Sequence, residues 1–195
     1  MKKLRFLIFI AFAAFSVQAC KNKTKDMTKA ADSANYTKDT SNHPANTGGI
    51  AVDKDDARFA VEAANGGMAE VGMGKLAEQL AANPKVKSFG EMMVNDHSKA
   101  NDELKKLARD KNITLPEAIS LDEQKTETDL SKKKGKDFDK AYVSNMIDDH
   151  KKDVKAFEDA IKNLKDPDLK AFAEKTLPTL KHHLNSIEAI HDSMK

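Results

Sequence analysis

Two Asp–His pairs occupy positions where the helical pattern of this chain calls for apolar residues. They are Asp96-His97 and Asp149-His150. Each histidine falls at the spacing of three and four residues that marks the buried face of a helix. Imidazole is a common ligand of transition metals, and carboxylates often hold such histidines in place. The two pairs therefore predict a buried polar site, provided that their helices pack side by side.

The region after residue 52 has a helical pattern throughout, without strand-like alternation. We expect four long helices, at about 53–82, 84–111, 137–164 and from 167 almost to the C-terminus. Asn83-Pro84 and Asp166-Pro167 are both typical of an N-cap followed by proline in the first turn, so the helices form two hairpins with tight turns. The long 112–136 connection carries a short helix at about 121–133, ended by Gly135.

This order of elements predicts an all-α protein, a four-helix bundle with a long connection between its second and third helices. The long crossover favours the ferritin-like arrangement, with the two tight turns at opposite ends, over simple up-and-down winding.

Each of the four expected helices carries one residue that does not belong in an apolar core. These residues are Glu70, His97, His150 and His183. The first two lie about 13 residues from the first turn, or about 20 Å at the α-helical rise. The last two lie about 16 and 17 residues from the second turn, or about 25 Å. In a bundle about 42 Å long, both pairs are near mid-height, so the sequence predicts a single cluster there.

One carboxylate and three imidazoles can supply four ligands to a divalent transition metal such as Fe, Zn, Mn or Cu. Asp96 and Asp149 lie about 100° round the helix from the histidines that follow them, so each is placed to support a histidine on an adjacent helix. The alternative is a buried Glu–His hydrogen-bond network that sets helix register and binds no metal. The sequence leaves both interpretations open.

Other signals are weaker. Glu188 and His191 form a Glu-x-x-His motif like that of di-iron carboxylate bundles, but a di-iron oxidase needs a second copy and two further glutamates. The methionines at 68, 73, 92, 93 and 146 could suggest Cu(I), yet methionine is routine filler in bundle cores. We find no nucleophile paired with a base and therefore assign no catalytic residue.

The N-terminus predicts export and a lipid anchor. Lys2, Lys3 and Arg5 precede an apolar stretch at 4–17 that is short for a membrane span, and Cys20 follows Ala19. This order resembles the lipobox of bacterial lipoproteins. We expect a signal peptide at 1–19, a lipidated Cys20 with a flexible linker to residue 52, and the bundle domain at 53–195. An ordinary secretory signal with a chance cysteine is the alternative.

Charge excludes one class of partner. Removal of 1–19 takes three of the 33 basic residues, leaving 30 against 31 acidic ones. Both signs are interspersed, so nucleic-acid binding has no electrostatic footprint. The expected partner is the membrane, through the lipid, while no protein partner is indicated. Lys21 after Cys20 favours the outer over the inner membrane of the bacterial cell envelope, with the domain in the periplasm or at the surface.

Several segments together resemble one protein family. They are Ala69–Ala77, Val86–Phe89, Met93–Asn101, Phe138–Tyr142, Met146–His150 and Leu177–Leu184. Their sequences are similar to those of the bacterial domain-of-unknown-function 4142 (DUF4142) family, over about residues 53–192. The resemblance implies a ferritin-like, exported protein, often described as an outer-membrane protein, with no established activity.

The motif residues of this family fall on Glu70, His97, His150 and His183, the same four that spacing and height single out. We therefore expect a lipid-anchored envelope protein that binds a transition metal at mid-bundle, for metal handling or envelope stress. The alternative is a structural or interaction lipoprotein whose polar cluster only specifies the core.

Overall fold

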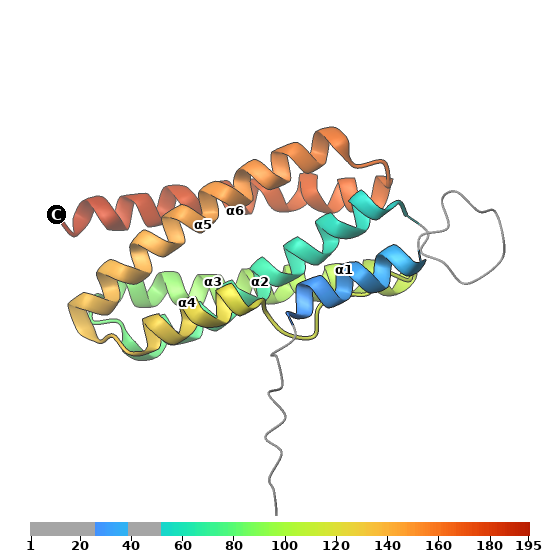
Figure 1. The fold of residues 1–195 in the computed structure, drawn as a ribbon. Coiled ribbons are helices and arrows are strands. Elements are labelled where there is room, and N and C mark those ends of the chain that lie inside the picture. Colours follow the sequence, from blue (N-terminus) through green and yellow to red (C-terminus); the bar gives the residue numbers. More distant parts are fainter. Residues whose placement is uncertain (1–25, 39–51) are drawn as a thin grey trace, which may run out of the picture.

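The structure, a computed structural model, describes residues 26–38 and 52–195 (Figure 1). Every regular element within these two ranges is an α-helix, which confirms the predicted all-α class. The helices are α1 (Met27–Lys38), α2 (Lys54–Leu80), α3 (Pro84–Asp110), α4 (Leu121–Ser131), α5 (Gly135–Asn163) and α6 (Pro167–Ser193). No helix of this described part combines the length and the apolar character needed to cross a membrane.

Local sequence explains where α3 and α6 begin. The Asn83 side chain accepts the Lys85 N–H at 2.9 Å, and Pro84 fills the first position of α3. Asp166 accepts the N–H groups of Asp168 and Leu169 at the start of α6. Such caps satisfy backbone donors that have no partner inside the helix. The two hairpins, α2–α3 and α5–α6, therefore have the tight turns that the sequence predicts.

The start of α5 differs from the prediction. Gly135 is the first residue of this helix and has a φ of 58°, whereas the sequence suggested a stop at Gly135 and an N-cap at Asp137. Glycine adopts a positive φ without steric strain, which lets the chain turn sharply from 132–134 into α5. The helix begins two residues earlier than expected because Gly135 starts α5 instead of ending the segment before it.

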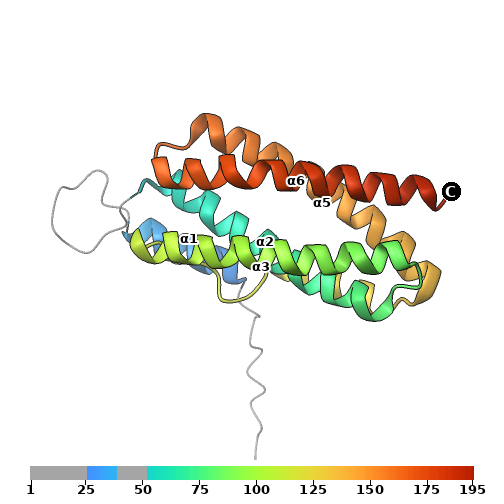
Figure 2. The same cartoon turned by 180° about the vertical axis from the view of Figure 1, so that it is seen from behind.

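The two tight turns lie at opposite ends of the bundle, and each is held by a buried aspartate of the other hairpin. Asp139, near the start of α5, accepts the backbone N–H groups of Ala82 and Asn83 at 3.1 and 2.9 Å. Asp56, near the start of α2, accepts those of Lys165 and Asp166 at 3.1 and 2.6 Å. Figure 1 shows α4 running beside α2 within the long crossover between the hairpins, and the view from behind shows α6 and α3 on the near side (Figure 2).

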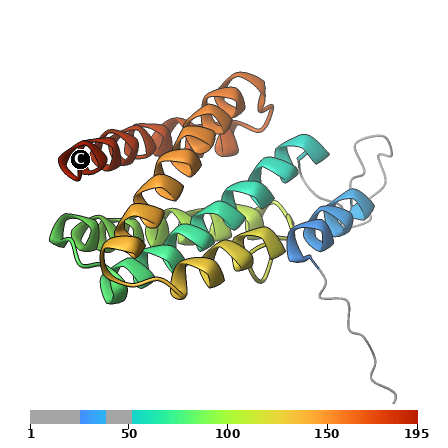
Figure 3. The same cartoon turned by 60° about the vertical axis from the view of Figure 1, so that its left-hand side comes forward.

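Seen with the C-terminal end brought forward, the hairpins form two layers (Figure 3). Helix α2 packs on α3 and α5, and α6 packs on α5 and α3. The four long helices thus enclose one core, and each contributes one face to it.

Helix α1 corrects the predicted linker. We expected residues 20–52 to be flexible because they hold few large apolar side chains, yet Met27–Lys38 is a helix packed on α2. Its buried Asn35 accepts the N–H of Thr114 at 2.7 Å and donates to the carbonyl of Thr114 at 2.9 Å. A polar tertiary contact therefore orders a segment that apolar burial alone would not. The predicted signal peptide, Cys20 and the rest of the linker lie outside the described residues.

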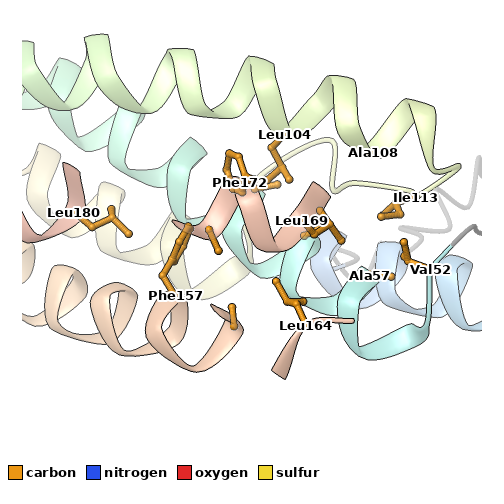
Figure 4. Packing of buried hydrophobic residues seen from close by; sticks show 14 residues of the cluster. Val52, Ala57, Leu104, Ala108, Ile113, Phe157, Leu164, Leu169, Phe172 and Leu180 are labelled. Atoms are coloured by element: carbon orange, nitrogen blue, oxygen red, sulfur yellow. The ribbon is translucent and has the colours of Figure 1, made fainter. Parts of the chain in front are cut away.

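The core consists of two apolar clusters. One, near the α5–α6 turn, includes Leu104, Phe157, Leu169 and Phe172 (Figure 4). The other, near the α2–α3 turn, includes the buried methionines Met73, Met93 and Met146 with Phe89, Phe138, Tyr142 and Ile187. On α3, α5 and α6 the predicted polar residue lies in sequence between the residues of the two clusters, and on α2 Glu70 directly follows Ala69, the first residue of the second cluster. A polar layer therefore separates two apolar halves of the bundle.

Candidate metal centre

Helices α2 and α3 approach each other closely beside the polar layer. A Cβ added at Gly74 would lie 2.8 Å from the carbonyl oxygen of Gly90, and one at Gly90 would lie 2.7 Å from that of Gly74. Since only glycine permits this contact, the pair sets the distance between the helices. One to two turns away, Glu70 and His97 meet, with Oε2 of the carboxylate 2.8 Å from Nδ1 of the imidazole. Both side chains are buried.

Helices α5 and α6 bring the other two predicted residues together. His150 Nε2 lies 3.4 Å from His183 Nδ1, and both side chains are fully buried. His150 Nδ1 is 2.9 Å from the carbonyl oxygen of Met146, one turn earlier on α5. The Phe89 ring of α3 packs edge-on against both imidazoles, with ring centroids 6.1 and 6.3 Å away. These contacts leave the two rings little freedom to rotate.

The two pairs form one cluster, as their heights in the sequence predict. Glu70 Oε1 lies 3.3 Å from His150 Nε2 across the α2–α5 contact. One ring nitrogen from each of His97, His150 and His183 lies within 4.8 Å of those from the other two. All four residues are therefore close enough to act on one bound group.

The two aspartates that precede histidines have different surroundings. Asp96 Oδ2 lies 3.2 Å from Nε2 of His183, so α3 supports a histidine of α6, as expected from its position on the helix. Asp149 instead pairs with Lys152 of its own helix at 3.3 Å and lines a separate acidic cavity. The expectation that Asp149 also supports a histidine is therefore not met, because it faces α2 and α4 rather than the cluster.

The hydrogen-bond partners fix which nitrogen of each ring carries the proton. The Met146 carbonyl can only accept, so His150 Nδ1 donates and Nε2 keeps its lone pair. The Asp96 carboxylate likewise places the proton of His183 on Nε2 and leaves a lone pair on Nδ1. Glu70 Oε2 places the proton of His97 on Nδ1 and leaves a lone pair on Nε2. Each ring is thus held by an acceptor on one side and presents a lone pair on the other.

Burial keeps these imidazoles neutral. It lowers the pKa of His97 to about 4 and that of His183 to about 4, in each case chiefly because a buried charge loses hydration. Burial also lowers the pKa of His150, although nearby Glu70 opposes this. Near neutral pH the rings carry no second proton, so the three free nitrogens are Lewis bases.

Within the described part of the chain, two atoms of the cluster have no hydrogen-bond partner. They are His97 Nε2 and Glu70 Oε1. The 3.3 Å contact between Glu70 Oε1 and His150 Nε2 lacks hydrogen-bond geometry. A cavity of about 30 Å³ borders His97, Glu70 and Asp153. This is large enough for one water molecule or one metal ion. A cation or a water molecule in this cavity could satisfy buried polar atoms of this kind.

Asp153 is a member of the site that sequence reasoning missed. Burial raises its pKa well above the usual range, and the neighbouring Glu70 carboxylate adds to the effect. Burial likewise raises the pKa of Glu70 to about 7, against the attraction of His150. Asp153 follows His150 by three positions, which places both on one face of α5. The available signal was this spacing, but the apolar Val154 next to it lies four positions after His150 and fits the same helical face.

The remaining candidates lie elsewhere. His182 and His191 are exposed, and Glu188 pairs with Lys151 of α5 at 3.3 Å, so the Glu-x-x-His motif is on the surface. Met73, Met93 and Met146 are buried among apolar side chains, in agreement with a role as core filler. Both observations keep the candidate site at mid-bundle.

The donor set fits a transition metal. Imidazole nitrogens bind zinc at about 2.0–2.1 Å, so the nitrogens of one tetrahedral site lie roughly 3.4 Å apart. His150 Nε2 and His183 Nδ1 already have this separation. His97 offers a third nitrogen, and Glu70 Oε1, which lies 3.3 Å from His150 Nε2, offers an oxygen. An acceptor on the outer nitrogen of each imidazole is the usual support of metal-bound histidines.

Three solved structures resemble this fold. CopM in the Cu(I)-bound form is 16% identical with a TM-score of 0.60, and the match covers 71% of this chain and 96% of CopM. CopM in the Ag-bound form is 17% identical with a TM-score of 0.59 and the same coverage. A DUF305 fragment from Deinococcus radiodurans is 11% identical with a TM-score of 0.64, again covering 71% and 96%. At these identities the likeness establishes the helical fold alone.

Comparisons of sequence give one match. No curated protein matches the chain. The profile of a family described as a domain of unknown function (DUF4142) matches residues 40–190, which is most of the chain.

Proposed function

The chain belongs to the DUF4142 family, as its motifs predict, and we propose that it binds one transition-metal ion through His97, His150 and His183. The observation that carries the proposal is the direction of the three imidazoles. Each imidazole places its single proton on the nitrogen that faces Glu70, Met146 or Asp96 and keeps a lone pair on its other nitrogen. One ring nitrogen from each histidine lies within 4.8 Å of those from the other two, so a single cation among the rings would be within reach of all three.

This geometry argues against the alternative of a hydrogen-bond network that only specifies the core. A satisfied network needs a donor for every acceptor, yet His150 Nε2 and His183 Nδ1 face each other without a proton between them. Among the described residues, His97 Nε2 has no hydrogen-bond partner. Above about pH 7, where Glu70 is ionised, the cluster has more acceptors than donors, as a metal site requires.

Glu70 has two roles in the proposed site. Its Oε2 orients His97, while its Oε1 is available as a fourth ligand. A carboxylate that both supports a histidine and binds the ion offsets one positive charge of the metal. Asp96 has only the supporting role, on His183. In this proposal Asp153 acts on Glu70 and not on the metal.

Copper is the metal we favour over Zn, Fe and Mn. Imidazole suits copper, and the affinities of divalent first-row ions for a given nitrogen site reach their maximum at Cu(II). The similar fold of CopM is known in Cu(I)-bound and Ag-bound forms. Two or three neutral imidazoles are also an adequate set for Cu(I), which needs few ligands. The role would be metal handling or protection from metal stress rather than catalytic turnover.

The proposal includes a location. The chain is exported, Cys20 carries the lipid, and the ferritin-like domain is held at the outer membrane. Support comes from the basic residues at 2, 3 and 5, the apolar stretch at 4–17 and Ala19-Cys20. Mass spectrometry of the N-terminal peptide from cells tests this. An acylated Cys20 as first residue is expected, and an unmodified cysteine would contradict the anchor.

Metal analysis of the detergent-purified full chain tests the central proposal. The chelator-stripped protein is loaded with Cu(I), Ag(I), Cu(II), Zn(II), Fe(II) or Mn(II), desalted, and assayed for bound metal by mass spectrometry. We expect one tightly bound copper per chain and a melting temperature that rises with the free metal concentration. His150→Gln abolishes both, whereas His182→Gln, at an exposed neighbour of His183, changes neither. The absence of any bound metal would favour the structural lipoprotein.

A further inference from the structure

A second, acidic cavity lies directly beside the candidate metal centre. Its volume is about 140 Å³, and α2, α4 and α5 form its walls. The ionisable side chains in these walls are Glu62, Glu70, Glu123, Asp149, Asp153 and Lys152. Five carboxyl groups thus face one ammonium group, which is itself paired with Asp149 at 3.3 Å. The cavity is a strongly acidic space in a chain whose charges are otherwise interspersed.

Helix α4 is fixed in the position that completes this cavity. Asn65 of α2 accepts the backbone N–H of Ser120 at 2.7 Å, and Ser120 caps α4 through the Glu123 N–H at 3.3 Å. Further along, a side chain at Gly72 would collide with the Glu127 carboxylate, so the two helices are in close contact there. The long crossover therefore carries Glu123 to the mouth of the cavity.

The acidic cavity and the small cavity at His97 share a wall. Gly66, Glu70 and Asp153 line both of them. Glu70 is 3% exposed, and its Oε1 has no hydrogen-bond partner. The other oxygen of Glu70, Oε2, already holds His97. A cation in the acidic cavity would therefore meet a carboxylate that also contacts the histidine cluster.

We propose that the acidic cavity is the access route by which a hydrated metal cation reaches the three histidines, with Glu123 and Asp149 attracting the ion and Glu70 passing it inward. The inference rests on the proposed function. A low-dielectric cleft lined with one sign of charge concentrates the opposite ion and raises its rate of association. Carboxylate oxygens replace the waters that the ion loses, before imidazole nitrogens bind it. On the α3–α6 side, Asp96 is held on His183.

Stopped-flow absorbance with Cu(II) tests this route on the full chain. We expect Glu123→Gln with Asp149→Asn to slow association about tenfold at low salt and to flatten its dependence on ionic strength. The matched control is Glu91→Gln with Asp102→Asn, which removes two exposed acids from α3. This control keeps the wild-type rate to within about twofold.

A steric variant gives an independent signature. A Cβ at Gly66 would lie 3.8 Å from Asp153 Oδ1, an ordinary contact, so alanine fits and a longer side chain extends into the shared wall. Gly66→Leu should slow association and dissociation of Cu(II) by the same factor and leave the equilibrium affinity unchanged, because a blocked passage affects both directions. Gly66→Ala is the size control.

The outcomes separate the two proposals. Wild-type protein that binds none of Cu(I), Ag(I), Cu(II), Zn(II), Fe(II) and Mn(II) overturns the proposed function, and if another of these ions binds in place of Cu(II), its association rate is the one that is compared. Tight binding with unchanged rate and salt dependence in the Glu123 and Asp149 double variant overturns the access route alone. Should Gly66→Leu fail to fold by circular dichroism, the charge variants decide by themselves.

Discussion

His150 Nε2 and His183 Nδ1 face each other at 3.4 Å across the α5–α6 hairpin, and neither nitrogen carries a proton. The protons of both rings are on the opposite nitrogens, held by the Met146 carbonyl and the Asp96 carboxylate. Burial lowers the pKa of both imidazoles, so a second proton does not bridge them near neutral pH. These two hydrogen bonds leave both facing nitrogens free to bind a cation between the rings.

The titration of Glu70 gives a prediction for the metal-free protein. Burial raises its pKa from 4.5 to about 7. Between these values the folded state holds a proton that the unfolded state has lost, so this contribution to stability is present below about pH 4.5 and is lost as pH rises through 7. Glu70→Gln removes the effect. Between pH 4.5 and 7.5, the free energy of unfolding of Glu70→Gln should therefore rise by about 1–3 kcal/mol relative to that of the wild type.

Urea unfolding in EDTA over this pH range measures the difference between the two proteins. Taking the difference removes the contributions of His97 and His183, whose lowered pKa values act in the opposite direction. Glu91→Gln, at an exposed position, should show no such trend. A difference between Glu70→Gln and wild type that stays constant or falls with pH would contradict the buried, protonated Glu70.

Asp96 should matter for metal affinity although it does not contact the metal. Asp96→Asn replaces an acceptor-only carboxylate with an amide that can donate, which permits His183 to turn its lone pair outward. Loss of such a support typically lowers metal affinity 10- to 100-fold. Competition with a chromophoric chelator measures this. Asp102→Asn, an exposed acid on the same helix, is the control, and equal affinities of the two variants would refute the role.

Asp139 should contribute strongly to stability. Its carboxylate accepts two backbone N–H groups of the α2–α3 turn, and Asp139→Ala would leave both without a partner. We expect a loss of about 2–4 kcal/mol in the free energy of unfolding by urea. Asp137→Ala, exposed two residues earlier, should cost under about 1 kcal/mol. A small effect of Asp139→Ala would mean that the hairpins are not held together at this turn.

The sequence was sufficient to place Glu70, His97, His150 and His183 in one layer. Helical rise is rigid and the turns at Asn83-Pro84 and Asp166-Pro167 are tight, so distance along the chain converts into height in the bundle. The pattern was less accurate in the first half of α2. Counting back from Glu70 in steps of three and four residues leads to Ala63 and Phe59, yet these are only partly buried, and Ala57, Ala60 and Ala64 are the buried residues there. Small residues on every face leave no clear stripe to follow.

What the sequence could not provide depends on tertiary contacts. Helix α1 is ordered by Asn35 against Thr114, a contact between residues 79 positions apart. The interaction of Asp153 with Glu70 joins two helices that are distant in the chain. Which nitrogen of each imidazole carries the proton depends on the acceptor beside the ring, and the spacing of residues along a helix does not reveal this. Residue positions were predictable, whereas hydrogen-bond partners were not.

X-ray absorption spectroscopy of the copper-loaded full chain tests the central claim most directly. The account predicts a first shell of three imidazole nitrogens at about 2.0 Å, with at most one additional oxygen and no sulfur. His97→Gln should reduce the imidazole scattering from three rings to two, while His182→Gln leaves the spectrum unchanged. A shell dominated by methionine sulfur, or one without imidazole scattering, would contradict a metal centre at His97, His150 and His183.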